Sequence, residues 1–213
     1  MSLAPLHLAD LRNSGLTDAT IREHQIESVR PCDIRRFIGF DISGLLSAYR
    51  LPFPPFKDGY QRLKLFYEEG TERYPDGSKK PKYIQRKGTR NRLYIPVPVF
   101  PLLDNWTATL HITEGEKKAL AATQAGIPCI AITGLWNWKQ PGGGLDRLIP
   151  DFGRIVWRGR KVRIVPDNDW LDLDSSGKQK NLKQAVFRLC RCLELRGAHT
   201  EIVLLPGGGP SYG

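Results

Sequence analysis

The second half of the chain alternates short apolar runs with segments of helical periodicity. The runs are TLHIT (109–113), PCIAIT (128–133) and KVRIVP (161–166). We expect helices at 116–126 and 181–197, the second because its apolar residues recur every three or four positions. Apolar strands without alternation, separated by helices, are typical of a mostly parallel sheet that is covered on both faces. This half is therefore predicted to have an α/β fold.

The first half has a different pattern. Residues 8–29 predict two short helices broken at 13–15, with Thr17 or Asp18 as the cap of the second. The chain then predicts three parts: an N-terminal helical segment (1–30), a small mainly β subdomain (31–105) and the α/β domain (106–213). The β-like runs of the subdomain, which proline and glycine interrupt, are GLLSAYRLP (44–52), QRLKLFYE (61–68), KYIQR (82–86) and RLYIPVPVF (92–100).

The composition limits the class of protein. With 213 residues, of which 40% are hydrophobic, the chain is long enough to build a hydrophobic core. No apolar run approaches the roughly 20 residues of a membrane helix, and the N-terminus MSLAPLHLAD lacks the features of a signal peptide. The four cysteines form no C-x-x-C pair and have no histidine at zinc-site spacing. We therefore expect a cytoplasmic protein that has no membrane partner and binds no zinc.

Positive charge is concentrated in one stretch. Residues 50–100 hold twelve Lys/Arg and five Asp/Glu, which is +7 of the net charge of +10. Tyrosines and phenylalanines run through the same stretch. Basic side chains bind phosphates and aromatic faces stack on bases, so this mixture suits a groove for single-stranded nucleic acid. A solvated β surface above an aromatic core is the alternative, and composition alone does not separate the two.

Carboxylates follow two of the predicted strands. Glu114 comes directly after TLHIT, and Asp167 and Asp169 come directly after KVRIVP. Because parallel strands end at one edge of a sheet, we expect all three side chains to face the same crevice. Gathered carboxylates repel one another, and Mg²⁺, with Mn²⁺ as a substitute, would compensate that charge through oxygen ligands and bridge to phosphates. Glu114 is a candidate general base or acid, or a further metal ligand.

The same acids have a purely structural interpretation. Asp167 and Asp169 are also suited to cap a following turn, and Glu114 to favour the N-terminus of the next helix. Lys117 and Lys118 begin that helix, against the preference of the helix dipole. They are expected either to contact substrate phosphates or to form salt bridges with the acids. Trp136 and Trp138 are expected to serve packing rather than stacking on a base.

Several of these motifs resemble a known family. EGEKKALAATQAGIP (114–128) followed by VPDND (165–169) resembles the Toprim domain of bacterial-type primases, topoisomerases and some nucleases. PKYIQRKGTRNRLYIP (81–96) is similar to a segment of bacterial primases, and IVLLPGGGP (202–210) is similar to the strand after the long Toprim helix. The order of the motifs is most similar to Toprim-like modules of plasmid and phage replication proteins.

The resemblance implies a DNA primase-like nucleotidyltransferase. It would synthesise RNA primers from nucleoside triphosphates on a single-stranded DNA template, together with a helicase domain or other replication proteins. By position, Glu114, Asp167 and Asp169 would be the catalytic and magnesium-binding acids, and Lys82 the basic residue of the primase Lys-Tyr segment. We predict contacts to nucleic acid or nucleotide from Lys82, Arg86, Lys87, Arg90, Arg92, Lys117 and Lys118.

The chain departs from the family pattern at two places. Lys118 stands where bacterial primases have the second acid of E-G-x-x-D, and residues 85–89 replace the primase N-S-P-E-T segment. The related modules also continue past the Leu-Pro-Gly strand, so a fragment with a truncated C-terminus is expected. Two alternatives therefore stay open: a Toprim nuclease that hydrolyses phosphodiesters, and a catalytically inactive nucleic-acid-binding module of a replication protein.

Overall fold

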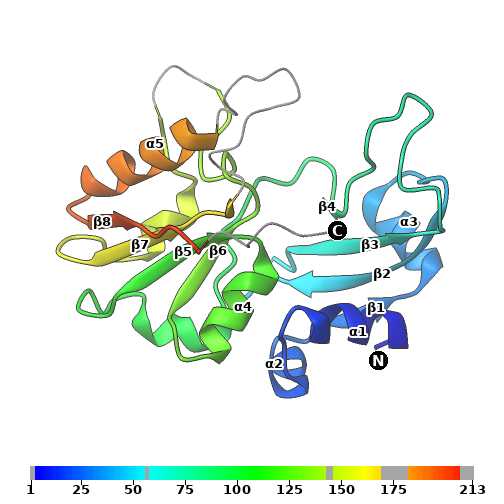
Figure 1. The fold of residues 1–213 in the computed structure, drawn as a ribbon, viewed down its shortest axis with the longest axis horizontal. Coiled ribbons are helices and arrows are strands. Elements are labelled where there is room, and N and C mark those ends of the chain that lie inside the picture. The colour runs from blue at the N-terminus through cyan, green and yellow to red at the C-terminus, as the bar shows by residue number, and fades with distance from the viewer. Residues whose placement is uncertain (1–2, 56–57, 143–145, 169–181, 207–213) are drawn as a thin grey trace. The chain divides into compact units, whose positions relative to one another are not determined.

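The chain forms two compact units, Met1–Arg90 and Asn91–Gly213. The computed structural model describes residues 3–55, 58–142, 146–168 and 182–206 (Figure 1). The segment 91–105, which the sequence grouped with the β-like runs, belongs to the second unit. Its residues Leu93, Ile95 and Val99 are buried in the core of that unit.

The first unit begins with the two predicted short helices. α1 spans Pro5–Asn13 and α2 spans Asp18–Glu23. Thr17 precedes α2, and its hydroxyl oxygen accepts a hydrogen bond from the Thr20 N–H at 3.3 Å. A side-chain acceptor at this position satisfies one of the backbone donors that a helix start leaves without a partner. The predicted helix pair and its Thr17 cap are therefore confirmed.

A third helix, α3 (Pro31–Ile38), was not expected from the sequence. Pro31 occupies its first turn, where the missing N–H costs nothing, and Gly39 ends it in the left-handed conformation with φ 85°. Ile34 and Ile38 are buried on one side of the helix. The core they form with the sheet of the first unit also contains Ala48, Leu63 and Leu65.

That sheet is antiparallel, with the strand order β1-β2-β3-β4 (Figure 1). Residues that are paired across two neighbouring strands point to the same face of the sheet. Ala48 opposes Leu65 on the face packed by α3, whereas Tyr49 opposes Lys64 on the other face. The strands are β1 (Glu27–Val29), β2 (Leu45–Pro52), β3 (Gln61–Tyr67) and β4 (Tyr83–Gln85).

α1 contacts the second face through His7. The imidazole is 1% exposed; its Nδ1 lies 2.7 Å from the Ser28 hydroxyl and its Nε2 2.9 Å from the Ser47 hydroxyl. The ring also contacts Tyr49 and Phe66, with ring centroids 5.6 and 4.8 Å away. Both imidazole nitrogens are therefore satisfied within a buried polar contact.

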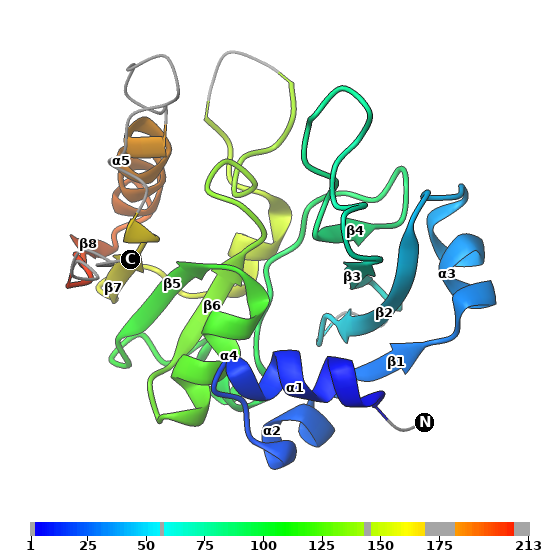
Figure 2. The same ribbon diagram turned by 45° about the vertical axis from the view of Figure 1, so that its right-hand side comes forward.

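The second unit contains the predicted parallel sheet, with the order β6-β5-β7-β8. Helices α4 (Glu116–Gln124) and α5 (Leu182–Glu194) lie on opposite sides of it (Figures 1 and 2). The α/β fold expected for this half is confirmed. The strands are β5 (Leu110–Glu114), β6 (Cys129–Ile132), β7 (Lys161–Val165) and β8 (His199–Ile202).

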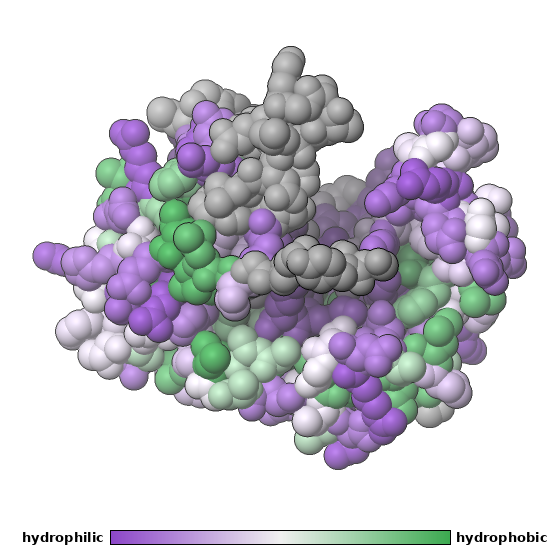
Figure 3. Space-filling view, in the orientation of Figure 1, coloured by the Kyte–Doolittle hydropathy of each residue, from purple (hydrophilic) through white to green (hydrophobic). Residues whose placement is uncertain are grey.

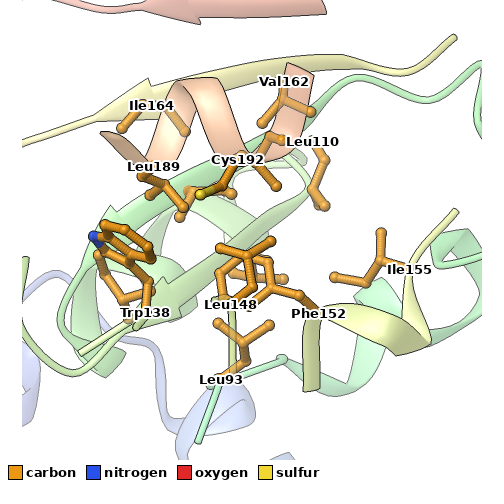
Figure 4. Close-up of a cluster of buried hydrophobic side chains, with 14 of the residues drawn as sticks. Leu93, Leu110, Trp138, Leu148, Phe152, Ile155, Val162, Ile164, Leu189 and Cys192 are labelled. Carbon is orange, nitrogen blue, oxygen red and sulfur yellow. The ribbon is translucent and has the colours of Figure 1, made fainter. Parts of the chain in front are cut away.

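The core of this unit lies between the sheet, α5 and two short 3₁₀ helices, η1 (Val97–Leu102) and η2 (Pro150–Arg154). Figure 4 shows Trp138, Leu148 and Phe152 in this core. Trp138 is 0% exposed, which confirms that it serves packing.

The prediction of a β-like run at 92–100 is wrong. Prolines 96, 98 and 101 remove N–H donors that a strand ladder needs, and the segment forms η1 instead. Only Tyr94 pairs with a strand: it exchanges hydrogen bonds of 2.8 and 2.9 Å with Ala131 of β6. Of the described helices, none has the length and apolar character to cross a membrane.

Candidate active site

The carboxyl edge of the parallel sheet carries two of the three predicted acids. β5 and β7 are neighbours, and Thr113 lies opposite Val165 in their register. Glu114 is the last residue of β5, and Asp167 follows the end of β7 by two residues. Both side chains are half-buried. The strand ends therefore bring Glu114 and Asp167 to the same edge, and Asp169 lies outside the described residues.

A glycine starts the turn that places Glu114 at the edge. Gly115 has a φ of 89°, a conformation that side chains disfavour, and its N–H donates to the Ile132 carbonyl at 2.9 Å. The chain turns here from β5 directly into α4. Glu116, in the first turn of α4, is 2% exposed. Burial, and then the charge of Glu116, raises the pKa of Tyr94 well above its ordinary value, so the Tyr94 phenol stays neutral.

The end of β6 contributes polar groups to the same edge. A Cβ added to Gly134 would lie 4.0 Å from Oε1 of Glu114 and 3.0 Å from Nδ2 of Asn137. Asn137 Nδ2 donates to the Thr133 hydroxyl at 3.1 Å. Gly134 therefore lies beside Glu114, and the hydrogen-bonded Thr133 and Asn137 lie next to Gly134, although the sequence analysis did not select them. The detectable signal was their place directly after an apolar strand that neighbours β5.

Lys118 pairs with Asp167. Its ammonium donates to Oδ1 of Asp167 across the sheet edge, and the two side chains are 54% and 35% exposed. The sequence left open whether Lys118 contacts a phosphate or a protein acid, and here its partner is the acid. Lys117 is half-buried in the same helical turn. Lys118 thus places a cation in contact with a predicted metal ligand.

Carboxylate oxygens are the donors that a hard divalent cation prefers. Glu114 and Asp167 offer carboxylate oxygens, and Mg²⁺ is commonly held by only one or two protein carboxylates together with water and phosphate oxygens. Within the described ranges, no three His, Cys, Asp or Glu side chains group closely enough to hold a metal ion. Any metal at this edge would also meet the Lys118 ammonium beside Asp167.

The predicted nucleic-acid-binding residues lie in different surroundings. Lys82 lines one pocket of the first unit, and Arg86 lines a second one. Lys87 and Arg90 are exposed. In the second unit, Arg92 is 28% exposed and pairs with the buried Asp151 at 3.1 Å, and Asp151 also accepts from the Leu93 N–H at 2.9 Å. Arg92 thus has a structural partner.

The pocket that contains Lys82 also holds basic residues that the sequence analysis missed. Lys64, Lys79 and Lys80 line it, together with Phe66 and Tyr67 of β3. The alternation in QRLKLFY places Arg62, Lys64 and Phe66 on one face of β3, and this was the available signal. The contribution of Lys79 and Lys80 depends on how the intervening chain folds back on β3.

The comparisons with known proteins identify a family. Residues 101–211 match the family described as "Domain of unknown function (DUF3854)". The chain belongs to this DUF3854 family. The matched residues include the four strands of the parallel sheet and the helices α4 and α5 that cover it.

A curated relative and a solved structure add context for this DUF3854 protein. The "Gene 57 protein" of Mycobacterium phage D29 is 34% identical over 97 residues, which cover 46% of this chain and 53% of that protein. The crystal structure of the Aquifex aeolicus primase (zinc binding and RNA polymerase domains) matches with a TM-score of 0.60 at 14% identity. That match covers 96% of this chain and 51% of the primase chain. The chain thus spans about half the length of each protein, and its fold is primase-like.

Proposed function

We propose that this protein is a primase-type nucleotidyltransferase core that makes RNA primers on single-stranded DNA with Mg²⁺. The observation that carries the proposal is the pair Glu114 and Asp167 at the ends of neighbouring parallel strands, in a primase-like fold. Carboxylates at this edge of an open parallel sheet are placed where ligands bind. Asp169, two residues beyond Asp167, would complete the ligand set.

The residues at the edge would divide the work of phosphoryl transfer. Asp167 and Glu114 would hold the cation, and Glu114 would accept the proton of the attacking hydroxyl at a carboxylate oxygen. The bound cation would neutralise charge on the triphosphate and its leaving group. Lys118 would add a positive charge beside the transferred phosphate. Most of the rate enhancement would then come from positioning and charge neutralisation.

The partners follow from the same proposal. Nucleoside triphosphates are the substrates, and a single-stranded DNA template would bind the basic and aromatic surface of the first unit, including Arg86, Lys87 and Arg90. The proposal also includes a helicase domain or other replication proteins as partners.

The experiment is templated ribonucleotide incorporation in the presence of Mg²⁺. We expect wild-type activity to be lost in Asp167→Asn and in Glu114→Gln. Glu201→Gln changes an exposed acid within β8, before the carboxyl end of that strand. It is the matched control and should retain activity. Equal activity in the two edge variants and the wild type would contradict the assignment. Labelled DNA supplied without nucleotides distinguishes a nuclease from a primase, since only hydrolysis would shorten the DNA.

The Lys118–Asp167 ion pair favours a second candidate, a nucleic-acid-binding module that has lost the metal chemistry. A lysine already compensates one of the carboxylates in this arrangement. The candidate predicts DNA binding that falls with salt but is unchanged by Mg²⁺ or by Asp167→Asn. Magnesium-dependent incorporation by the wild type excludes it.

A further inference from the structure

The chain between β3 and β4 folds into a hairpin that lines an open pocket of the first unit. The Tyr74 N–H donates to the Ser78 carbonyl at 2.8 Å, and the Lys80 N–H donates to the Glu72 carbonyl at 2.9 Å. Arg73 and Lys79 pair between these two bonds. The hairpin projects from the sheet (Figure 1), and its surface is largely hydrophilic (Figure 3). A cavity of about 620 Å³, the hairpin pocket, lies between this hairpin and β3.

The hairpin pocket gathers positive charge from two directions. β3 contributes Lys64, and the hairpin and the chain after it contribute the others. The lining side chains that are charged at neutral pH are Lys64, Arg73, Lys79, Lys80 and Lys82, with Glu72 as the single carboxylate among the described residues. The lining thus has a net charge of +4 in a cavity of the size that holds small ligands.

One of these lysines also fixes the hairpin. Lys80 is 8% exposed, and its ammonium donates to the Ser43 carbonyl at 2.7 Å. The same ammonium lies 5.4 Å from the ring centroid of Tyr67 and 5.8 Å from that of Tyr74. These contacts hold the Lys80 ammonium beside the pocket and connect the hairpin to the chain before β2. Lys79 and Lys82 are exposed at the same pocket and are the residues best placed to meet a ligand.

We propose that the hairpin pocket binds the phosphate chain of a nucleoside triphosphate. A triphosphate brings about four negative charges in one compact chain, which matches the +4 of the lining, and charge-assisted hydrogen bonds to phosphate oxygens are strong. A DNA strand instead carries one charge per nucleotide, so its charge is spread along the chain, whereas a triphosphate concentrates its charge at one place. Recognition through phosphates alone would not distinguish bases. The inference deepens the proposed function, because nucleoside triphosphates are its substrates.

The test is metal-free binding of inorganic tripolyphosphate, ATP and GTP to the full chain by calorimetry. Lys79→Gln/Lys82→Gln should weaken all three by about tenfold or more, since each lysine contributes a charge-assisted hydrogen bond. Lys79→Arg/Lys82→Arg should bind within about threefold of the wild type because it keeps the charges. Arg22→Gln/Lys183→Gln removes the same charge from exposed positions outside the pocket and should also bind within about threefold.

Three outcomes would overturn the inference. Equal weakening in the Arg22/Lys183 control would mean that only net charge matters. Loss of metal-free binding in Asp167→Asn would place the triphosphate at the sheet edge of the second unit. Weakened binding of a DNA oligonucleotide, with unchanged tripolyphosphate binding, would make the pocket a strand site. If tripolyphosphate binding follows the lysines while primer synthesis is absent, the inference stands and the proposed function fails.

Discussion

At the scale of single residues, Lys118 sets the charge balance of the sheet edge. Its ammonium and the Asp167 carboxylate are partly exposed, so water and salt screen their attraction. Such a pair contributes little to stability and separates easily. A divalent cation carries twice the charge of an ammonium and would compete for the same oxygens.

We therefore expect Lys118→Gln to strengthen Mn²⁺ binding by about threefold to tenfold, because it removes the competing ammonium. The attraction between two opposite charges near water is worth about 1 kcal/mol. Titration of Mn²⁺, followed by paramagnetic resonance of the remaining ion, measures the change. Lys183→Gln on α5 removes the same charge elsewhere and should leave the affinity unaltered. Weaker Mn²⁺ binding in Lys118→Gln would show that the lysine supports the site.

His7 gives the first unit a dependence on pH. Burial lowers the pKa of its imidazole below 6.5, and the charge of Asp10 only partly opposes this effect. In the unfolded chain the ring takes up a proton as the pH falls below about 6.5, while the folded ring resists protonation. The stability from His7 is thus present above pH 6.5 and is lost as the pH falls toward the folded pKa.

This stability is measurable by urea unfolding at pH 7.5 and 5.5, recorded on the wild type and on His7→Gln. We expect the wild type to lose more unfolding free energy between the two conditions than the variant does. His111, whose pKa burial also lowers, remains in both proteins, so the difference between them isolates His7. Identical losses would rule out a contribution from His7.

At the scale of elements, the root of the hairpin depends on Gly44. It has a φ of 69°, and a Cβ there would lie 2.2 Å from Oγ1 of Thr71. Its carbonyl accepts from the Glu68 N–H at 2.9 Å and from the Thr71 hydroxyl at 3.2 Å. The tight approach of Thr71 to Gly44 joins the start of the hairpin to the start of β2.

Gly44→Ala should therefore destabilise the protein more than Gly59→Ala. Both positions have positive φ, 69° and 71°, so both variants incur about 1–2 kcal/mol of backbone strain. Only Gly44 meets a neighbour, because nothing lies within 4 Å of a Cβ at Gly59. Overpacking should add about 1–3 kcal/mol at Gly44, readable from the urea midpoint. Equal midpoints in the two variants would contradict the close approach.

Elements with strong periodicity could be predicted from the sequence. β5, β6, β7, α4 and α5 follow from apolar runs and helical spacing, because each packs against the sheet core through neighbouring positions in the chain. α3 was missed although its sequence carries helical signals: Ile34, Phe37 and Ile38 recur at helical spacing between Pro31 and Gly39. The run at 92–100 has strand-like side chains, but its prolines remove the required donors.

The candidate site divides in the same way. Glu114 and Asp167 were detectable because acids directly after parallel strands must share an edge. The partner of Lys118 was not decidable, since it depends on the side chains of residues 49 positions apart in the chain. The hairpin pocket was also missed, because Lys64 and Lys80 come together only through the fold of the chain between them.

At the scale of the whole molecule, each unit has a core of its own. The core of the second unit contains Leu93, Trp138 and Phe152, all from residues 91–213. We expect a fragment of these residues to fold alone and to unfold cooperatively, because a separate core is what independent folding requires. Near-ultraviolet circular dichroism with thermal unfolding tests this. A fragment without a cooperative transition would show that the second unit needs the first.

The excess of positive charge should make binding of single-stranded DNA strongly dependent on salt. The logarithm of the affinity should fall against the logarithm of the salt concentration by about 0.7 for each phosphate neutralised. If Arg86, Lys87 and Arg90 each neutralise one phosphate, changing all three to glutamine should reduce the slope by about 2. Fluorescence anisotropy of a labelled oligonucleotide at several salt concentrations gives both slopes. An unchanged slope would place the strand elsewhere.

The bridge between Tyr94 and Ala131 occupies the outward N–H and C=O of Ala131, in the edge strand β6, where a sheet ordinarily exposes backbone groups to other chains. The other border of that sheet is β8. Strand addition from another molecule, in a dimer or in an amyloid-like aggregate, therefore meets a competing backbone pair at β6. Substitutions intended to prevent self-association through this sheet should therefore be placed in its other edge strand, β8.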